Sequence, residues 1–282
     1  ICLFRYLDGT IQNLYLTGDL YTEWNKVGPL VGEIFGGKVL NVVCDVNVLS
    51  GYPGDGAISG LVGRGSADGS LIENCIFAGT ITGSNYNSAA FIGWSGSLST
   101  ITNCAFTGSI EVDASQGNPY TFARNPGNVT CTSCYFVNEF GSHQDNTTQI
   151  AEEDVKSGRL CYLLNGDQSQ IVWNQTIEES KIPVPFPTQE RVYNAGDVYG
   201  NAYDAATYAD FAQKVLDVER EYCNDLLAQK SLVESYLESL DALESCNNID
   251  EFMTVWNNLL ELRNSVKSCA EAYAAYQKKV EI

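Results

Sequence analysis

The sequence is poor in basic residues and in histidine. It has 16 Lys and Arg against 35 Asp and Glu, and one His, so its formal net charge is −19 over 282 residues. Such a surface repels phosphate backbones, and we expect no nucleic-acid partner. With His143 the only histidine, Cys131-Thr-Ser-Cys134 is at most half of a zinc site. We therefore expect no metal and no cofactor.

The chain also lacks long apolar runs. None reaches the length of a transmembrane helix, so we expect this part of the protein not to span a membrane. It carries no signal peptide and begins at Ile1 without Met, inside a repeat described below. We interpret it as a fragment whose targeting signal lies outside the sequence.

Glycine is absent after Gly200, although 21 of the 25 glycines lie in residues 1–141. The glycine-rich half predicts many turns, and the tail, rich in Ala, Leu, Glu and Tyr, predicts helices. Between them, Lys181-Ile-Pro-Val-Pro-Phe-Pro187 cannot be helical. We place the domain boundary at residue 200, with one domain over 1–200 and a second over 201–282.

Residues 1–141 contain about five imperfect repeats of near 30 residues. Four of them contain an asparagine at the same position, at spacings of 28, 33 and 29 residues: Asn13, Asn41, Asn74 and Asn103. Ser133 follows 30 residues later, and the short motif Leu61-Val-Gly63 recurs in phase. A fixed period with variable loops predicts stacked units, here a β-solenoid of the right-handed parallel β-helix type.

Alternation within each repeat predicts strands with one apolar, inward face. One inward column contains Leu14, Val42, Cys75, Cys104 and Cys134. Gly18, Gly79 and Gly108 share a column where small residues leave room for a bend or for the close approach of a neighbouring backbone. The four asparagines tolerate the left-handed backbone of a sharp corner, and their amides can form a ladder between coils, so we assign them a structural role.

The repeats resemble the GLUG-type repeats of cell-surface proteins. The resemblance rests on Gly60-Leu-Val-Gly63 with Ile72-Glu-Asn-Cys-Ile-Phe-Ala-Gly79, and on Phe91-Ile-Gly93 with Ile101-Thr-Asn-Cys-Ala-Phe-Thr-Gly108. It implies secreted, adhesin-like proteins of gut bacteria and provides no catalytic residues to carry over. The last repeat departs from the pattern at Ser133 and at Phe122-Ala-Arg124, as terminal repeats often do.

After the repeats we expect a helix near residues 150–165 that covers the open end of the core, and then the Pro-rich tail. From about residue 203, apolar residues recur three and four apart, which is typical of coiled-coil helices. The clearest break is Asn247-Asn248-Ile-Asp250. We predict an antiparallel two-helix hairpin, or a small three-helix bundle with a further break near Lys230.

The chain has ten cysteines. Cys75, Cys104 and Cys134 fall in the inward column, where cysteine acts as a small hydrophobe. In a hairpin folded at Asn247-Asn248, Cys223 and Cys269 lie at similar levels. The pair forms either a disulfide that clamps the helices or two free buried thiols.

No outward strand column holds two adjacent acids, which glycoside hydrolysis requires. We therefore predict a non-enzymatic, extracellular binding or adhesion module with an unknown glycan or protein ligand. The alternatives are a structural stalk that displays another domain and a carbohydrate-active β-helix enzyme. Trp94, beside Phe91-Ile-Gly93, is the candidate for stacking on a sugar ring, although packing against a neighbouring loop would also explain it.

Overall fold

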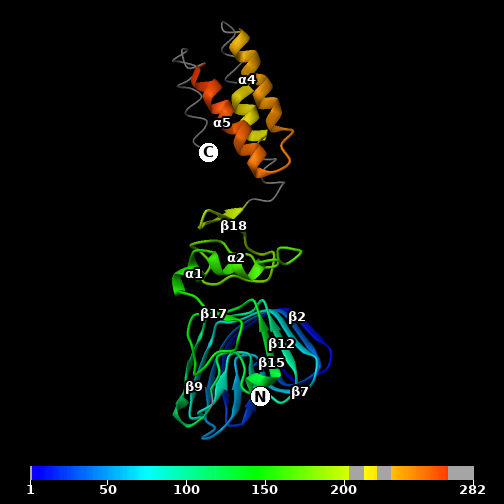
Figure 1. Cartoon of the computed structure of the whole chain (residues 1–282), viewed down its shortest axis with the longest axis vertical. Helices are drawn as coiled ribbons and strands as arrows, with labels where there is room; N and C mark the ends of the chain where they lie inside the picture. The colour runs from blue at the N-terminus through cyan, green and yellow to red at the C-terminus, as the bar shows by residue number, and fades with distance from the viewer. Residues whose placement is uncertain (1, 118, 203–212, 221–229, 266–282) are drawn as a thin grey trace. The chain divides into compact units, whose positions relative to one another are not determined.

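The chain divides into two units, Ile1–Ala202 and Tyr203–Ile282. A computed structural model describes residues 2–117, 119–202, 213–220 and 230–265 (Figure 1). Among the described helices, none has both the length and the apolar character needed to cross a membrane.

The first unit is a parallel β-solenoid of about five turns, as the repeats predict. The strands of the solenoid form three sheets, and every strand pair within them is parallel. Sheet A consists of β1 (Phe4–Leu7), β4 (Val31–Phe35), β7 (Val62–Ala67) and β11 (Ile92–Ser95). Sheet C consists of β3 (Lys26–Val27), β6 (Ala57–Ser59) and β10 (Ser88–Ala89).

Sheet B is the largest, with ten strands. They are β2 (Thr10–Thr22), β5 (Lys38–Ser50), β8 (Ser70–Phe77), β9 (Thr80–Gly83), β12 (Ser99–Thr102), β13 (Ala105–Phe106), β14 (Ser109–Glu111), β15 (Val129–Thr132), β16 (Cys134–Phe136) and β17 (Thr147–Gln149). Two single-turn 3₁₀ helices, η1 (Ala114–Gln116) and η2 (Pro126–Asn128), lie in the loops of the last coil.

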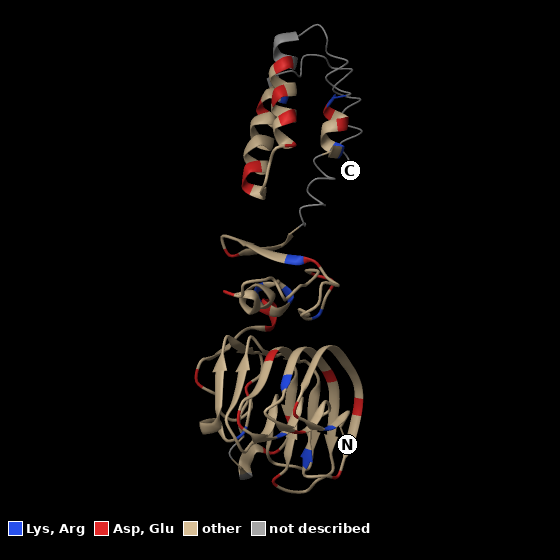
Figure 2. Ribbon diagram, turned by 90° about the vertical axis from the view of Figure 1, so that its right-hand side faces the viewer, with Lys and Arg blue, Asp and Glu red and all other residues tan. Residues whose placement is uncertain are grey.

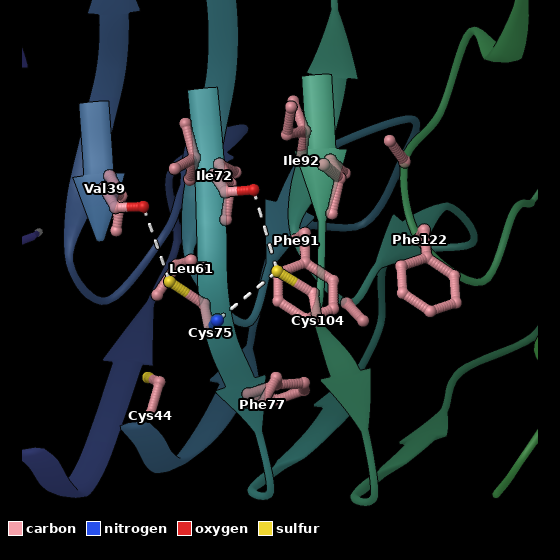
Figure 3. Close-up of a cluster of buried hydrophobic side chains, with 14 of the residues drawn as sticks. Val39, Cys44, Leu61, Ile72, Cys75, Phe77, Phe91, Ile92, Cys104 and Phe122 are labelled. Carbon is pink, nitrogen blue, oxygen red and sulfur yellow. Dashed lines mark hydrogen bonds between the residues drawn. The ribbon is translucent and has the colours of Figure 1, made fainter. Parts of the chain in front are cut away.

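The predicted inward column is buried. Leu14 pairs with Val42 and Val42 with Cys75, and the residues that follow Cys75, Cys104 and Cys134 pair in the same register. Val42, Cys75 and Cys104 are fully buried, whereas Leu14, in the first coil, is half-buried. Figure 3 shows Cys75 and Cys104 side by side among apolar side chains of successive coils.

Aromatic rings also stack from coil to coil inside the solenoid. The Phe77 and Phe106 rings lie 5.7 Å apart at 5°, and the Phe91 and Phe122 rings 5.4 Å apart at 8°. A close approach is present at Gly79 and Gly108 but not at Gly18, where an added Cβ would meet nothing within 4 Å and φ is 129°. A Cβ on Gly79 would lie 2.1 Å from the carbonyl oxygen of Val46, and one on Gly108 1.9 Å from that of Gly79, so neither position has room for a side chain.

The expected single helix near residues 150–165 is two short helices, α1 (Glu152–Lys156) and α2 (Arg159–Asn165). Gly158, at φ 90°, separates them, because this left-handed conformation interrupts a right-handed helix. The segment ends in an antiparallel hairpin of β18 (Arg191–Ala195) and β19 (Val198–Ala202), which the sequence analysis did not predict.

This segment, residues 150–202, is called the cap. The sequence predicts that it covers the open end of the solenoid core, but the structure places it elsewhere. Its buried side chains Val155, Leu160 and Trp173 join a cluster separate from the solenoid core. That cluster includes Val43 and Ile76, which point outward from sheet B, and both are fully buried. The cap therefore packs on the outer face of sheet B.

In the second unit, the described helical parts are residues 213–220, α4 (Lys230–Leu243) and α5 (Ile249–Ser265). The break at Asn247-Asn248 is confirmed, and Asn248 Oδ1 accepts a hydrogen bond of 3.0 Å from the Glu251 N–H. Tyr236, Leu240 and Leu259 are among the buried residues of one apolar cluster. The predicted hairpin as a whole is not established, because residues 221–229 and 266–282, with Cys223 and Cys269, lie outside the described residues.

Candidate functional site

Trp94 lies in β11 on the outward face of sheet A. The register places it beside Arg64, Arg64 beside Glu33, and Glu33 beside Tyr6, so these four side chains form one outward row across the coils. The Trp94 side chain is 39% exposed. Regular stacking thus brings residues about 30 positions apart in the sequence onto adjacent strands.

Arg124 occupies the position of the repeat that is glycine in the earlier coils. A Cβ on Gly93 would lie 2.5 Å from the Ala57 backbone, which explains the glycine there. Arg124 extends over the Trp94 ring, with its Cζ 5.1 Å from the ring centroid. It forms an ion pair of 2.7 Å with Asp55, and its Nη1 donates to the Gly56 carbonyl oxygen at 2.9 Å. The buried Arg124 guanidinium of the last coil is therefore bound to the Asp55-Gly56 loop, which lies two coils earlier.

These groups surround a small hollow of about 240 Å³, here called the corner pocket, which residues from sheets A and C line. Its walls are Asn25, Lys26, Asp55, Ala57, Arg64, Trp94 and Arg124. Asp55 also accepts a hydrogen bond of 2.9 Å from the Asn87 amide. An exposed indole beside fixed charges and amides can hold a ligand that has both an apolar face and polar groups.

The sequence alone identified Trp94 and missed the other residues of the pocket. In the sequence, Arg124 is only a departure of the last repeat from the pattern. One feature of the sequence could have indicated the pocket. Arg124 places a long charged side chain at the repeat position where the earlier coils have Gly32, Gly63 and Gly93.

Asn13, Asn41 and Asn74 lie in strands of sheet B and Asn103 lies between β12 and β13, with φ values of 58°, 53°, 52° and 49°. The Asn41 amide donates to Asn13 Oδ1 at 2.9 Å. Asn74 Oδ1 instead accepts a hydrogen bond from the Trp173 indole of the cap at 3.3 Å. Ser133 and Asn146, at φ 50° and 61°, continue the same corner.

A second hollow lies between sheet B and the cap, with a volume of about 670 Å³. Tyr15, Asp45 and Thr107 line it from the sheet, and Lys156 and Lys181 line it from the cap. Beside this hollow, a row of polar side chains on successive coils of sheet B is linked by hydrogen bonds. Asn47 donates to Asp19 and accepts from Thr80, each at 2.9 Å.

Cys131 and Cys134 are buried in the last coil. A hydrogen bond with the Cys134 thiol, together with burial, raises the pKa of Cys131. Within the described ranges, no three or more His, Cys, Asp or Glu side chains are grouped so as to hold a metal ion.

No protein-family model matches this chain, and no curated protein matches it. Among solved structures, it is similar to one described as a "putative immunoglobulin A1 protease" from Bacteroides ovatus, at a TM-score of 0.50 and 15% identity. The match covers 64% of this chain and 61% of that chain. At this identity the likeness concerns the fold alone.

Proposed function

We propose that this chain is a non-enzymatic binding or adhesion module of a larger secreted bacterial protein, and that the corner pocket holds a sugar. One observation carries the proposal: an exposed tryptophan ring borders a hollow lined by Asp55, Asn25 and Arg124. The C–H face of a sugar ring packs on an aromatic face, and its hydroxyls bond to amides and charged groups.

The architecture supports display at a cell surface. The solenoid has a continuous core of stacked side chains and presents outward rows at regular spacing. The resemblance to GLUG-type, adhesin-like repeats supports an extracellular location. In this proposal residues 201–282 form an antiparallel coiled-coil hairpin or a small bundle that acts as a spacer.

A glycan array tests the proposal. The full chain is expected to bind a restricted set of glycans, and Trp94→Ala is expected to lose at least tenfold in affinity. Tyr6→Ala is the matched control, because Tyr6 is an exposed aromatic residue in the same outward row. The proposal fails if the parent binds no glycan, as a purely structural stalk would, or if Trp94→Ala binds as the parent does.

A further inference from the structure

The charge of the corner pocket is opposite to that of the chain as a whole. Three of the 16 basic residues, Lys26, Arg64 and Arg124, line this one hollow, and Asp55 is the one carboxylate among its lining residues. Figure 2 shows how sparse Lys and Arg (blue) are in the first unit. On a surface of net charge −19, an anionic ligand is repelled except where cations gather.

Both guanidinium groups have N–H donors to spare. The Nε atoms of Arg64 and Arg124 are buried, and neither has a hydrogen-bond partner among the described residues. Arg64 Nη1 lies 3.7 Å from Glu33, which is a loose ion pair. These Nε atoms are closed to solvent, so a ligand group would meet the guanidinium groups at their other nitrogens, and it would do so chiefly at Arg64, whose side chain is 36% exposed.

The donors approach one another at the turn after β11. A Cβ on Gly96 would lie 3.6 Å from the Trp94 indole nitrogen and 3.8 Å from Arg64 Nε. The Trp94 indole nitrogen and Arg64 Nε thus both lie beside Gly96. Carboxylate and sulfate groups accept several hydrogen bonds and donate none, which suits such a donor set.

From this placement we infer that the corner pocket selects anionic sugars, namely a single pyranose ring that carries a carboxylate or a sulfate. This inference rests on the proposed function. The ring packs on Trp94, and the anionic group accepts from Arg64 and Arg124. A volume of 240 Å³ corresponds to roughly eight water molecules, which suits one sugar residue.

A matched set of ligands tests the inference on the full chain by NMR titration. Methyl glucuronide has a carboxylate where methyl glucoside has a hydroxymethyl group. Glucose 6-sulfate is the sulfated sugar of the set. We expect at least one anionic sugar to bind at least tenfold more tightly than methyl glucoside. The anionic sugar with the larger gain in affinity over methyl glucoside shows whether the pocket prefers a carboxylate or a sulfate. A gain below tenfold, or tighter binding of the neutral sugar, overturns the inference and leaves the proposed function standing. If none of the three sugars binds, the inference is overturned, and the glycan array alone decides the proposed function.

Two variants test whether the preference for an anionic sugar comes from the corner pocket. Arg64→Gln is expected to lose the preference for the anion and to keep binding of the neutral sugar, because Trp94 is untouched. Arg5→Gln is the matched control: it removes one positive charge from sheet A outside the pocket and should leave the preference unchanged. Circular dichroism verifies the fold of each variant. An unchanged preference in folded Arg64→Gln contradicts the inference.

Discussion

Each coil turns sharply at one residue of sheet B. At Asn41 the backbone has φ 53°, a region that costs most L-residues roughly 1–2 kcal/mol but that asparagine tolerates. The corner leaves nearby backbone groups without strand partners, and buried thiols bond to them. Cys104 Sγ accepts from the Cys75 N–H at 3.3 Å and donates to the Thr102 carbonyl oxygen at 3.1 Å. Cysteine in this column is therefore a hydrogen-bonding group as well as the small hydrophobe that was predicted.

Replacements at Asn41 separate backbone strain from side-chain bonding. Asn41→Ala is expected to destabilise the solenoid by about 1–3 kcal/mol, since it keeps the strain and loses the bond to Asn13. Asn41→Gly should cost less, because glycine adopts positive φ readily. Urea denaturation of both variants gives the comparison, and a glycine variant less stable than the alanine variant would contradict this role.

The inward face can be tested by a buried charge. Phe106 is fully buried and stacks on Phe77, so Phe106→Asp is expected to cost several kcal/mol. Thr100→Asp is the control, because Thr100 is exposed in the same coil. If Phe106→Asp melted at the temperature of the parent, the strand register would be wrong.

Among the elements of the first unit, the strands that repeat could be placed from the sequence, whereas the cap could not. The inward columns were visible because each apolar position recurs in the neighbouring coils. The cap has no such recurrence, and its place depends on contacts far apart in the sequence, such as that of Trp173 with Asn74. One signal was present: Val43, Ile76 and Ala105 form an outward column that is apolar, and the cap cluster contains all three.

Residues 213–220 contain a buried acid. Burial raises the pKa of Glu219 to about 7, although the hydrogen bond from the Tyr236 hydroxyl and the charge of Arg263 act to lower it. Between the ordinary value of 4.5 and about 7, the folded state binds more protons than the unfolded state. The stability that this carboxyl contributes is therefore complete below pH 4.5 and is lost as the pH rises through about 7.

The free energy of unfolding in urea, followed by the helical signal at 222 nm, should consequently be higher at pH 5 than at pH 8 by on the order of 3 kcal/mol. Glu219→Gln removes the titrating group and should flatten this dependence. Glu238→Gln, at an exposed position in α4, should leave it intact. A pH dependence that persists in Glu219→Gln would assign it to another group.

At the scale of the whole molecule, the sequence predicted the solenoid and the change to helices near residue 200, because both follow from composition and local period. It predicted little of the corner pocket. Asp55 and Arg64 lie in one coil, Trp94 in the next and Arg124 in the one after, so the stacking register brings them together. Side chains that converge in this way leave no local pattern in the sequence.

Catalysis can be measured on the full chain directly. We expect no release of reducing ends or unsaturated products from common plant and host glycans. The reason is that no outward column pairs two adjacent acids. Product formation that a single Asp or Glu substitution abolishes would contradict the non-enzymatic proposal.

The most direct test of the central claim, that ligand binds at the corner pocket, uses the indole N–H signals of the four tryptophans. In a two-dimensional ¹H–¹⁵N NMR spectrum each tryptophan gives one indole signal, and Trp94→Phe assigns that of Trp94. Titration with a sugar that the chain binds should shift the Trp94 signal and leave the buried Trp173 signal in place. Saturable binding that leaves the Trp94 signal unmoved would contradict the account.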